Sequence, residues 1–244
     1  MIDAESELSK AVKHFWKTRS NQSKRQGSAT GKKDAGSRGS VTGGKHADGF
    51  VNLLAAIVHN AGLPKARIHA AEKKARTLPG FFRPSKEWDL LIVSGSDLVA
   101  AVEVKSQVGS FGNNFNNRVE EALGNATDFW TAYGQGVFKP SQKPWLGYLF
   151  MLEEHEQSVR PTQRINLTPF KVDEAFQALS YAQRYELVCE RLVRERLYDA
   201  ACFFTSNSKD GRRGDYSQPN DELSIRNFAI SLHARAAAFA QIKS

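Results

Sequence analysis

Residues 88–105 read WDLLIVSGSDLVAAVEVK and carry the clearest secondary-structure signal in the chain. Two β-rich runs, Trp88 to Val93 and Leu98 to Lys105, flank the tetrapeptide Ser94-Gly95-Ser96-Asp97. Serine, glycine and aspartate between two such runs are typical of a tight turn. The stretch therefore predicts an antiparallel β-hairpin at the centre of the fold.

Apolar periodicity on both sides of this hairpin predicts the remaining elements. Amphipathic patterns predict helices over residues 4–19, 47–60, 117–133 and 181–197, the last capped by Ser180, and a final helix capped by Asn220. Short β-rich runs predict strands over residues 67–73, 145–152 and 200–205. We therefore expect one mixed α/β domain with a central mixed sheet of four or five strands flanked by helices.

Positive charge is concentrated near the N-terminus. The formal net charge is +8, and residues 20–44 hold five basic side chains against one acidic side chain, together with six glycines. The basic residues of this stretch are Lys24, Arg25, Lys32, Lys33 and Arg38. We expect an N-terminal helix over residues 1–19, a flexible basic arm over 20–44 and a single domain over 45–244. The arm is either a solvated linker or a segment that orders on DNA phosphates.

Composition excludes several classes of protein. The hydrophobic fraction of 41% is too high for a wholly disordered chain. The longest apolar run, Leu53 to Val58, has six residues, whereas a membrane-spanning helix needs about 20. The N-terminus lacks a secretory pattern, and two cysteines fit a reducing compartment. We expect a cytoplasmic protein, and its basic balance favours a polyanion such as nucleic acid as partner.

The predicted hairpin brings two carboxylates and a lysine together. Because alternate residues of a strand share a face, Asp89 in the first strand lies on the face that carries Glu103 and Lys105 in the second. A three-residue turn from Gly95 to Asp97 would place Asp89 directly opposite Glu103. A two- or four-residue turn would point the carboxylates to opposite faces unless a β-bulge intervened.

Two opposed carboxylates need a compensating charge. Like charges directly opposite in a sheet lie about 4.5–5.5 Å apart and repel each other. A Mg²⁺ ion removes that cost, and it prefers one or two carboxylates together with water and phosphate oxygens. Lys105 could neutralise charge on a phosphodiester transition state. The pattern predicts metal-dependent phosphodiester hydrolysis, and its alternative is an exposed acid beside an ordinary Glu103–Lys105 ion pair.

The segment that follows the hairpin is rich in side chains able to read bases. Asparagine and glutamine bond adenine, and arginine bonds guanine, in the major groove of DNA. The candidates are Ser106, Gln107, Asn113, Asn114, Asn116, Asn117 and Arg118. The alternative is a helix N-terminus capped by asparagine.

Further basic residues could contact DNA at two other places. Lys209, Arg212 and Arg213 follow the last predicted strand, where a solvated surface loop is the alternative. Lys45 and His46 precede the helix expected from residue 47, where an ordinary helix start is the alternative. The histidines and cysteines show no zinc-binding spacing, and the sequence has no Walker-type glycine loop.

The pattern of Asp89, Glu103 and Lys105, with Pro84 upstream, resembles the PD-(D/E)XK nuclease superfamily. The contiguous string EVKSQVGSFGNNFNNR over residues 103–118 is more specific, and it resembles the XhoI family of restriction endonucleases. In one departure from the superfamily pattern, Trp88 directly precedes Asp89 where proline is usual, and Pro84 lies five residues back.

The resemblance implies a fold and an activity. The fold would be a PD-(D/E)XK restriction-endonuclease-like core. The activity would be that of a homodimeric type II enzyme that requires Mg²⁺, cuts double-stranded DNA at the palindrome CTCGAG and leaves 5′-TCGA overhangs. Such an enzyme works beside a cognate DNA methyltransferase in the bacterial cytoplasm.

The resemblance also implies roles for individual residues. Asp89 and Glu103 would bind the metal, with the carbonyl of Val104 as a further ligand, and Lys105 would be the catalytic lysine. Superfamily members often add an acid from a helix before the sheet, for which Asp48 is the candidate and Glu72 the alternative.

Two other functions fit the same residues. One is a structure-selective repair or junction nuclease of the same superfamily, which would cut by DNA shape. The other is a non-catalytic DNA-binding module whose carboxylates are only structural.

Overall fold

The computed structural model describes residues 2–30, 46–64 and 67–242. Its centre is a five-stranded sheet of order β1-β4-β5-β6-β7. The strands are β1 (Ile68–His69), β4 (Leu90–Ser94), β5 (Asp97–Gln107), β6 (Trp145–Glu153) and β7 (Ala200–Ser206). β1, β4 and β5 pair antiparallel, whereas β5, β6 and β7 pair parallel. The expected mixed α/β fold with a central mixed sheet is therefore confirmed.

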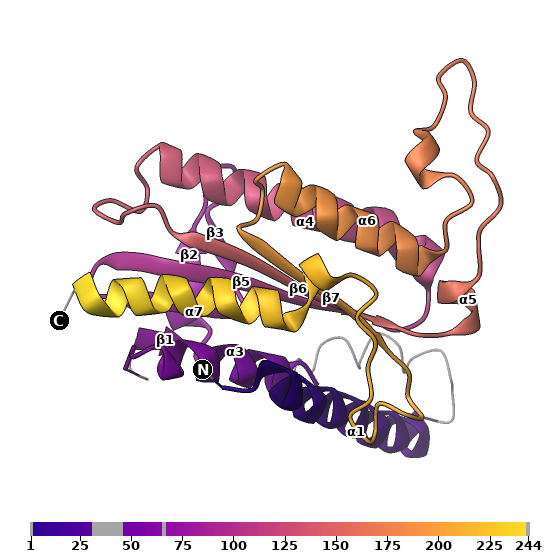
Figure 1. The fold of residues 1–244 in the computed structure, drawn as a ribbon, viewed down its shortest axis with the longest axis horizontal. Coiled ribbons are helices and arrows are strands. Elements are labelled where there is room, and N and C mark those ends of the chain that lie inside the picture. The colour runs from indigo at the N-terminus through magenta and orange to yellow at the C-terminus, as the bar shows by residue number, and fades with distance from the viewer. Residues whose placement is uncertain (1, 31–45, 65–66, 243–244) are drawn as a thin grey trace.

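Helices cover both faces of this sheet (Figure 1). One face is covered by α1 (Ala4–Thr30), α3 (Asp48–Asn60) and α7 (Ile225–Ile242), and the other by α4 (Phe111–Gly134) and α6 (Tyr181–Arg194). The short helix α5 (Glu156–Val159) follows β6, and single 3-10 turns lie at Lys74–Arg76, Glu174–Phe176 and Asp221–Leu223. No helix in the described part of the chain is long and apolar enough to span a membrane.

A separate two-stranded hairpin precedes β4. Its strands are β2 (Thr77–Pro79) and β3 (Ser85–Glu87), which pair antiparallel. Sequence periodicity did not predict this hairpin, because each strand has only three residues and the connection contains glycine and proline. It lies between the expected strand at 67–73, of which only Ile68–His69 pairs, and the central hairpin.

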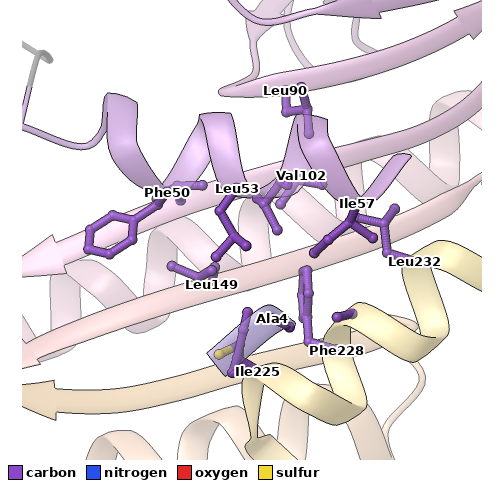
Figure 2. Close-up of a cluster of buried hydrophobic side chains, with 14 of the residues drawn as sticks. Ala4, Phe50, Leu53, Ile57, Leu90, Val102, Leu149, Ile225, Phe228 and Leu232 are labelled. Atoms are coloured by element: carbon purple, nitrogen blue, oxygen red, sulfur yellow. The ribbon is translucent and has the colours of Figure 1, made fainter. Parts of the chain in front are cut away.

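The apolar core on the α1, α3 and α7 side explains why these helices form. Figure 2 shows Leu53 and Ile57 of α3 near Val102 of β5 and Phe228 of α7, and Phe50 of α3 belongs to the same cluster. Each of these side chains is at most 3% exposed. Burial of one such side chain contributes about 1.5–3 kcal/mol, so the stripes predicted for the helices coincide with the surfaces that pack.

Helix α1 corrects the predicted boundary of the N-terminal segment. The helix was expected to end at residue 19 and to be followed by an arm over 20–44, but it continues to Thr30. Residues 20–30 have no apolar stripe, and periodicity therefore gives no sign of the extra helical turns. Leu8, Val12 and Phe15 are fully buried, so α1 belongs to the main core and is not an appended segment. Residues 31–45 lie outside the described residues.

Two other helix starts differ from the predictions. α4 begins at Phe111 and not at residue 117, because Phe111 is buried and anchors the first turn. Asn220 caps the 3-10 turn Asp221–Leu223, and α7 starts only at Ile225. The predicted cap of α6 is confirmed, since Ser180 and Gln183 exchange hydrogen bonds as a capping box.

Candidate active site

The β4–β5 hairpin closes through a two-residue turn, Gly95-Ser96, which is one of the turn lengths that the sequence left open. Gly95 has a φ of 66°, in the left-handed region that glycine enters without strain. A two-residue turn alone would point Asp89 and Glu103 to opposite faces of the sheet.

A β-bulge restores the predicted register. Val93 pairs with Leu98, but the next pair is Ile92 with Ala100, which leaves Val99 as the extra residue on β5. A bulge shifts the register by one residue and so reverses which side chains share a face. Of the alternatives left open by the sequence, the structure therefore has the two-residue turn combined with a bulge.

The register beyond the bulge brings the two candidate carboxylates together. Leu90 pairs with Val102, so the preceding residue, Asp89, lies opposite Glu103. The Val104 amide donates a hydrogen bond of 2.8 Å to Oδ2 of Asp89, which fixes this carboxylate across the two strands. The structure thus confirms the predicted arrangement of Asp89, Glu103 and Lys105.

Glu103 is the most buried group of the site and is paired with two lysines. Its side chain is 2% exposed and makes ion pairs with Lys105 and, at 2.9 Å, with Lys86 of β3. The Lys86 side chain is 12% exposed, and its ammonium lies 4.6 Å from the ring centroid of Trp88. Two carboxylates and two ammonium groups therefore form a charge-balanced cluster.

Lys86 was not among the site residues predicted from the sequence. It lies in a three-residue strand that has no recognisable pattern, and its contact with Glu103 spans the two sheets. The only feature of the sequence that points to Lys86 as a site residue is its position three residues before Asp89.

The surroundings shift the pKa values of the three predicted residues. Burial, together with the nearby Glu103 carboxylate, raises the pKa of Asp89. Burial alone would raise the pKa of Glu103, but the charges and hydrogen bonds of Lys105 and Lys86 outweigh it and hold that pKa below its usual value. Burial alone would lower the pKa of Lys105, but Glu103 and Asp89 outweigh it and raise that pKa. Glu103 and Lys105 are therefore held in their charged forms.

The donor set fits a hard divalent cation. Asp89 and Glu103 offer carboxylate oxygens, and Mg²⁺ is usually bound by one or two carboxylates with its remaining positions left to water and phosphate oxygens. Within the described residues, no group of three or more His, Cys, Asp or Glu side chains is placed to hold a metal ion. The exposed side chains of Asp48 and Glu72 therefore do not complete a three-acid cluster with the opposed pair.

Comparison with known proteins identifies the family. A family model described as Restriction endonuclease XhoI matches residues 25–218, which is more than half of the chain and includes the whole carboxylate–lysine cluster. The chain belongs to the XhoI restriction endonuclease family.

Individual members of this family are similar over most of their length. The chain is 45% identical over 218 residues to the type II restriction enzyme BstVI of Geobacillus stearothermophilus, across 87% of this chain and 96% of that protein. It is 42% identical over 183 residues to the type II restriction enzyme XhoI of Xanthomonas vasicola, across 75% of this chain and 72% of that protein. It is 46% identical over 160 residues to the type II restriction enzyme AbrI of Azospirillum brasilense, across 65% of this chain and 70% of that protein. No solved structure matches the chain.

Membership of the XhoI family makes this chain a restriction endonuclease, that is, a site-specific DNA nuclease.

The carboxylate–lysine cluster lies near the edge of the sheet where three parallel strands end. β5, β6 and β7 run parallel, so their carboxyl ends, with the segments that follow them, lie at one edge of the sheet. Lys105 lies two residues from the end of β5 and therefore near this edge.

The asparagine-rich segment lies in the first two turns of α4 and not in a loop. Asn113, Asn116 and Asn117 are exposed and share one helical face at spacings of three and four residues. Asn114 is half-buried and donates from Nδ2 to the Ser110 carbonyl at 3.0 Å. Arg118 makes an ion pair with Glu121. The three exposed asparagines are therefore the predicted base-reading candidates of this segment that remain accessible.

Two predicted DNA contacts are buried in the structure. Gln107 is 4% exposed and donates to the carbonyl of Gly109. His46 is 8% exposed and packs edge-on against Phe15 of α1. Both side chains fill the protein interior, which corrects the prediction that they meet DNA. Ser106 is half-buried near the end of β5.

The basic loop after β7 is exposed and packs beside α1. Arg212 donates to Ser20 at 3.1 Å, and Arg213 pairs with Asp210 at 2.7 Å and Asp215 at 3.3 Å. Lys209 is exposed. Of the basic residues expected in the arm, Lys24 and Arg25 belong to α1, whereas Lys32, Lys33 and Arg38, with Lys45, lie outside the described residues.

Proposed function

We propose that this chain is a type II restriction endonuclease that hydrolyses double-stranded DNA at the palindrome CTCGAG with Mg²⁺ and leaves 5′-TCGA overhangs. The observation that carries the chemistry is the bulged register, which sets Asp89 opposite Glu103 with Lys105 on the same face. Relatives named type II restriction enzymes, at 42–46% identity, support the class of reaction. The base sequence of the site rests on the family resemblance of residues 103–118.

Each residue of the cluster has a proposed role. Asp89, Glu103 and the Val104 carbonyl would hold Mg²⁺. Bound there, Mg²⁺ would supply Lewis-acid activation and charge neutralisation for attack of water on phosphorus. Lys105, held charged by Glu103, would stabilise the negative charge that develops on the phosphate oxygens.

Recognition of a palindrome implies a symmetric assembly. We propose a homodimer in which each protomer reads one half-site. The exposed asparagines of α4 would read bases. The phosphates would be contacted by basic side chains, namely Lys24, Arg25, Lys32, Lys33, Arg38, Lys45, Arg118, Lys209, Arg212 and Arg213. We also propose a cytoplasmic bacterial enzyme that works with a cognate DNA methyltransferase.

The catalytic role of Lys105 is tested by Lys105→Ala. We expect the variant to bind a CTCGAG duplex like the wild-type protein but to cleave it at least about 10²-fold more slowly, because it lacks a charge at the developing oxyanion. Binding would be measured by fluorescence anisotropy in EDTA, and cleavage under single-turnover conditions with Mg²⁺.

Lys10→Ala is the matched control, because Lys10 is an exposed lysine of α1 that pairs with Glu7 at 2.6 Å. Efficient cleavage by Lys105→Ala would refute its catalytic role. Cleavage of branched DNA without sequence preference by the wild-type protein would favour a structure-selective nuclease. DNA binding without cleavage in either Mg²⁺ or Mn²⁺ would favour a non-catalytic module.

A further inference from the structure

The tip of the β2–β3 hairpin exposes two adjacent aromatic rings. Phe81 is 48% exposed and Phe82 is 68% exposed, and their ring centroids lie 4.9 Å apart in an edge-to-face arrangement. An isolated exposed apolar side chain is ordinary, but two large rings together at a hairpin tip form a surface suited to a partner.

The tip is held in one conformation by a buried carboxylate of α4. Asp128, whose side chain is 7% exposed, accepts hydrogen bonds from the Phe81 amide at 2.9 Å and the Phe82 amide at 2.8 Å. It also accepts a bond of 2.8 Å from Nε of Arg83. A Cβ on Gly80 would lie 2.7 Å from Asp128, so glycine is needed for this close approach. The rings are therefore presented on a preorganised loop.

The hairpin connects the tip directly to the active site. Lys86, four residues after Phe82, pairs with Glu103. Residues 81–84 are bends and only Ser85–Glu87 is a strand, so Phe82 lies within about 13 Å of Lys86, the span of four fully extended residues. Successive base pairs of DNA are spaced by about 3.4 Å, so the tip is within about four base pairs of a phosphate bound at the cluster.

The charges near the tip indicate which part of DNA it meets. Arg83 is paired with Asp128 at 2.8 Å, and Lys86 is paired with Glu103 at 2.9 Å. With these cations neutralised, the exposed surface of the tip is the pair of aromatic rings. Aromatic side chains bind nucleic acid by stacking on bases or by wedging between base steps, not through phosphates.

We propose that Phe81 and Phe82 contact bases of the substrate DNA beside the scissile phosphate. This proposal rests on the proposed function for the position of the duplex. The aromatic tip and the basic residues have distinct tasks, since the rings act on bases while the lysines and arginines act on phosphates.

The test is the double variant Phe81→Ala/Phe82→Ala, with Phe170→Ala as the matched control. Phe170 is 83% exposed in the projecting segment between α5 and α6 (Figure 1). Affinity for a CTCGAG duplex carrying 2-aminopurine beside the cleavage position would be measured in EDTA over a range of salt concentrations. All three substituted side chains are exposed, and melting curves would verify that the variants fold.

We expect the double variant to bind at least about tenfold more weakly, which corresponds to about 1.4 kcal/mol. The dependence of log Kd on log salt should keep its slope, because base contacts release no counterions. The wild-type protein should raise 2-aminopurine fluorescence, and the double variant should not. Phe170→Ala should match the wild-type protein in each measurement.

Three results would overturn the proposal. Affinity and fluorescence equal to those of the wild-type protein would show that the tip does not touch bases. A reduced salt slope would assign the tip to phosphates. Loss of a dimer by the double variant in sedimentation experiments without DNA would assign the tip to a protein interface.

A wild-type protein without preference for CTCGAG would refute the proposed function. The two variants would still be compared on the duplex that the wild-type protein binds.

Discussion

The charge of Glu103 is balanced by side chains of the protein itself. A buried carboxylate is costly unless it is paired and hydrogen-bonded, and Glu103 makes ion pairs with both Lys86 and Lys105. Two lysines are more than one carboxylate needs, but they match the combined charge of Asp89 and Glu103. At the residue scale, the lysines supply the positive charge that a divalent cation would add.

This balance predicts the behaviour of Lys86→Met. Without Mg²⁺ the variant should lose about 1–3 kcal/mol of unfolding free energy, because one oxygen of the buried Glu103 loses its partner. Mg²⁺ should restore part of this loss and should stabilise the variant more than the wild-type protein. Thermal denaturation with and without Mg²⁺ measures both effects.

Lys73→Met provides the comparison, since Lys73 is 79% exposed and pairs with Glu87 at 3.1 Å. A surface pair of this kind contributes about 0–1 kcal/mol. An identical response to Mg²⁺ in the wild-type protein and Lys86→Met would contradict the proposed charge compensation.

At the scale of elements, two hairpins with different origins build the site. The β4–β5 hairpin was predictable from its apolar runs, although its turn and bulge were not, because a bulge depends on tertiary packing more than on composition. The β2–β3 hairpin was not predictable, since its tip depends on Asp128, which lies more than forty residues further along the chain. Local patterns do not reveal such distant contacts.

Asp128→Asn tests how the distant carboxylate supports the hairpin. The substitution preserves size but replaces one acceptor by a donor that faces Arg83. We expect a loss of about 1–3 kcal/mol of unfolding free energy at neutral pH, measured by denaturant titration. An unchanged midpoint would show that the tip does not depend on this residue.

The same residue predicts a pH dependence. Burial alone would raise the pKa of Asp128, but the amides of Phe82 and Phe81 and the guanidinium of Arg83 outweigh it and hold the pKa below its usual value. A lowered folded-state pKa adds stability above the unfolded-state pKa of about 3.9, and this stability is lost as the pH falls through the folded-state pKa. The difference between wild-type protein and Asp128→Asn should be constant above about pH 5 and shrink below about pH 4. A constant difference down to pH 3 would contradict this assignment.

At the scale of the whole molecule, sequence patterns predicted the sheet and its flanking helices because those elements bury apolar stripes. They missed the polar end of α1, which has no apolar stripe, and the early start of α4, where the buried Phe111 stands among glycine and asparagine residues. The three central site residues were predicted because Glu103 and Lys105 lie on the strongly patterned β5 and Asp89 directly precedes the strongly patterned β4. Lys86 was not, because its strand is short and its partner lies in another sheet.

Helix α1 contacts the carboxyl-end edge of the sheet through β7 and the loop that follows it. Trp16 donates from Nε1 to Ser206 at the end of β7 at 3.0 Å, and Ser20 accepts from Arg212 at 3.1 Å. The helix therefore passes the carboxyl-end edge of the sheet on the face where Val102 and Val104 pack, whereas the alternating Glu103 and Lys105 face α4 and α6.

The central claim is most directly tested by digestion of a plasmid with mapped CTCGAG sites, followed by sequencing of the fragment ends. A matched plasmid with one base pair of each site changed is the control. We predict discrete fragments with 5′-TCGA ends in Mg²⁺, no cleavage in EDTA and no cleavage of the control. Ends at other sequences, a smear of fragments, or equal cleavage of both plasmids would contradict the account.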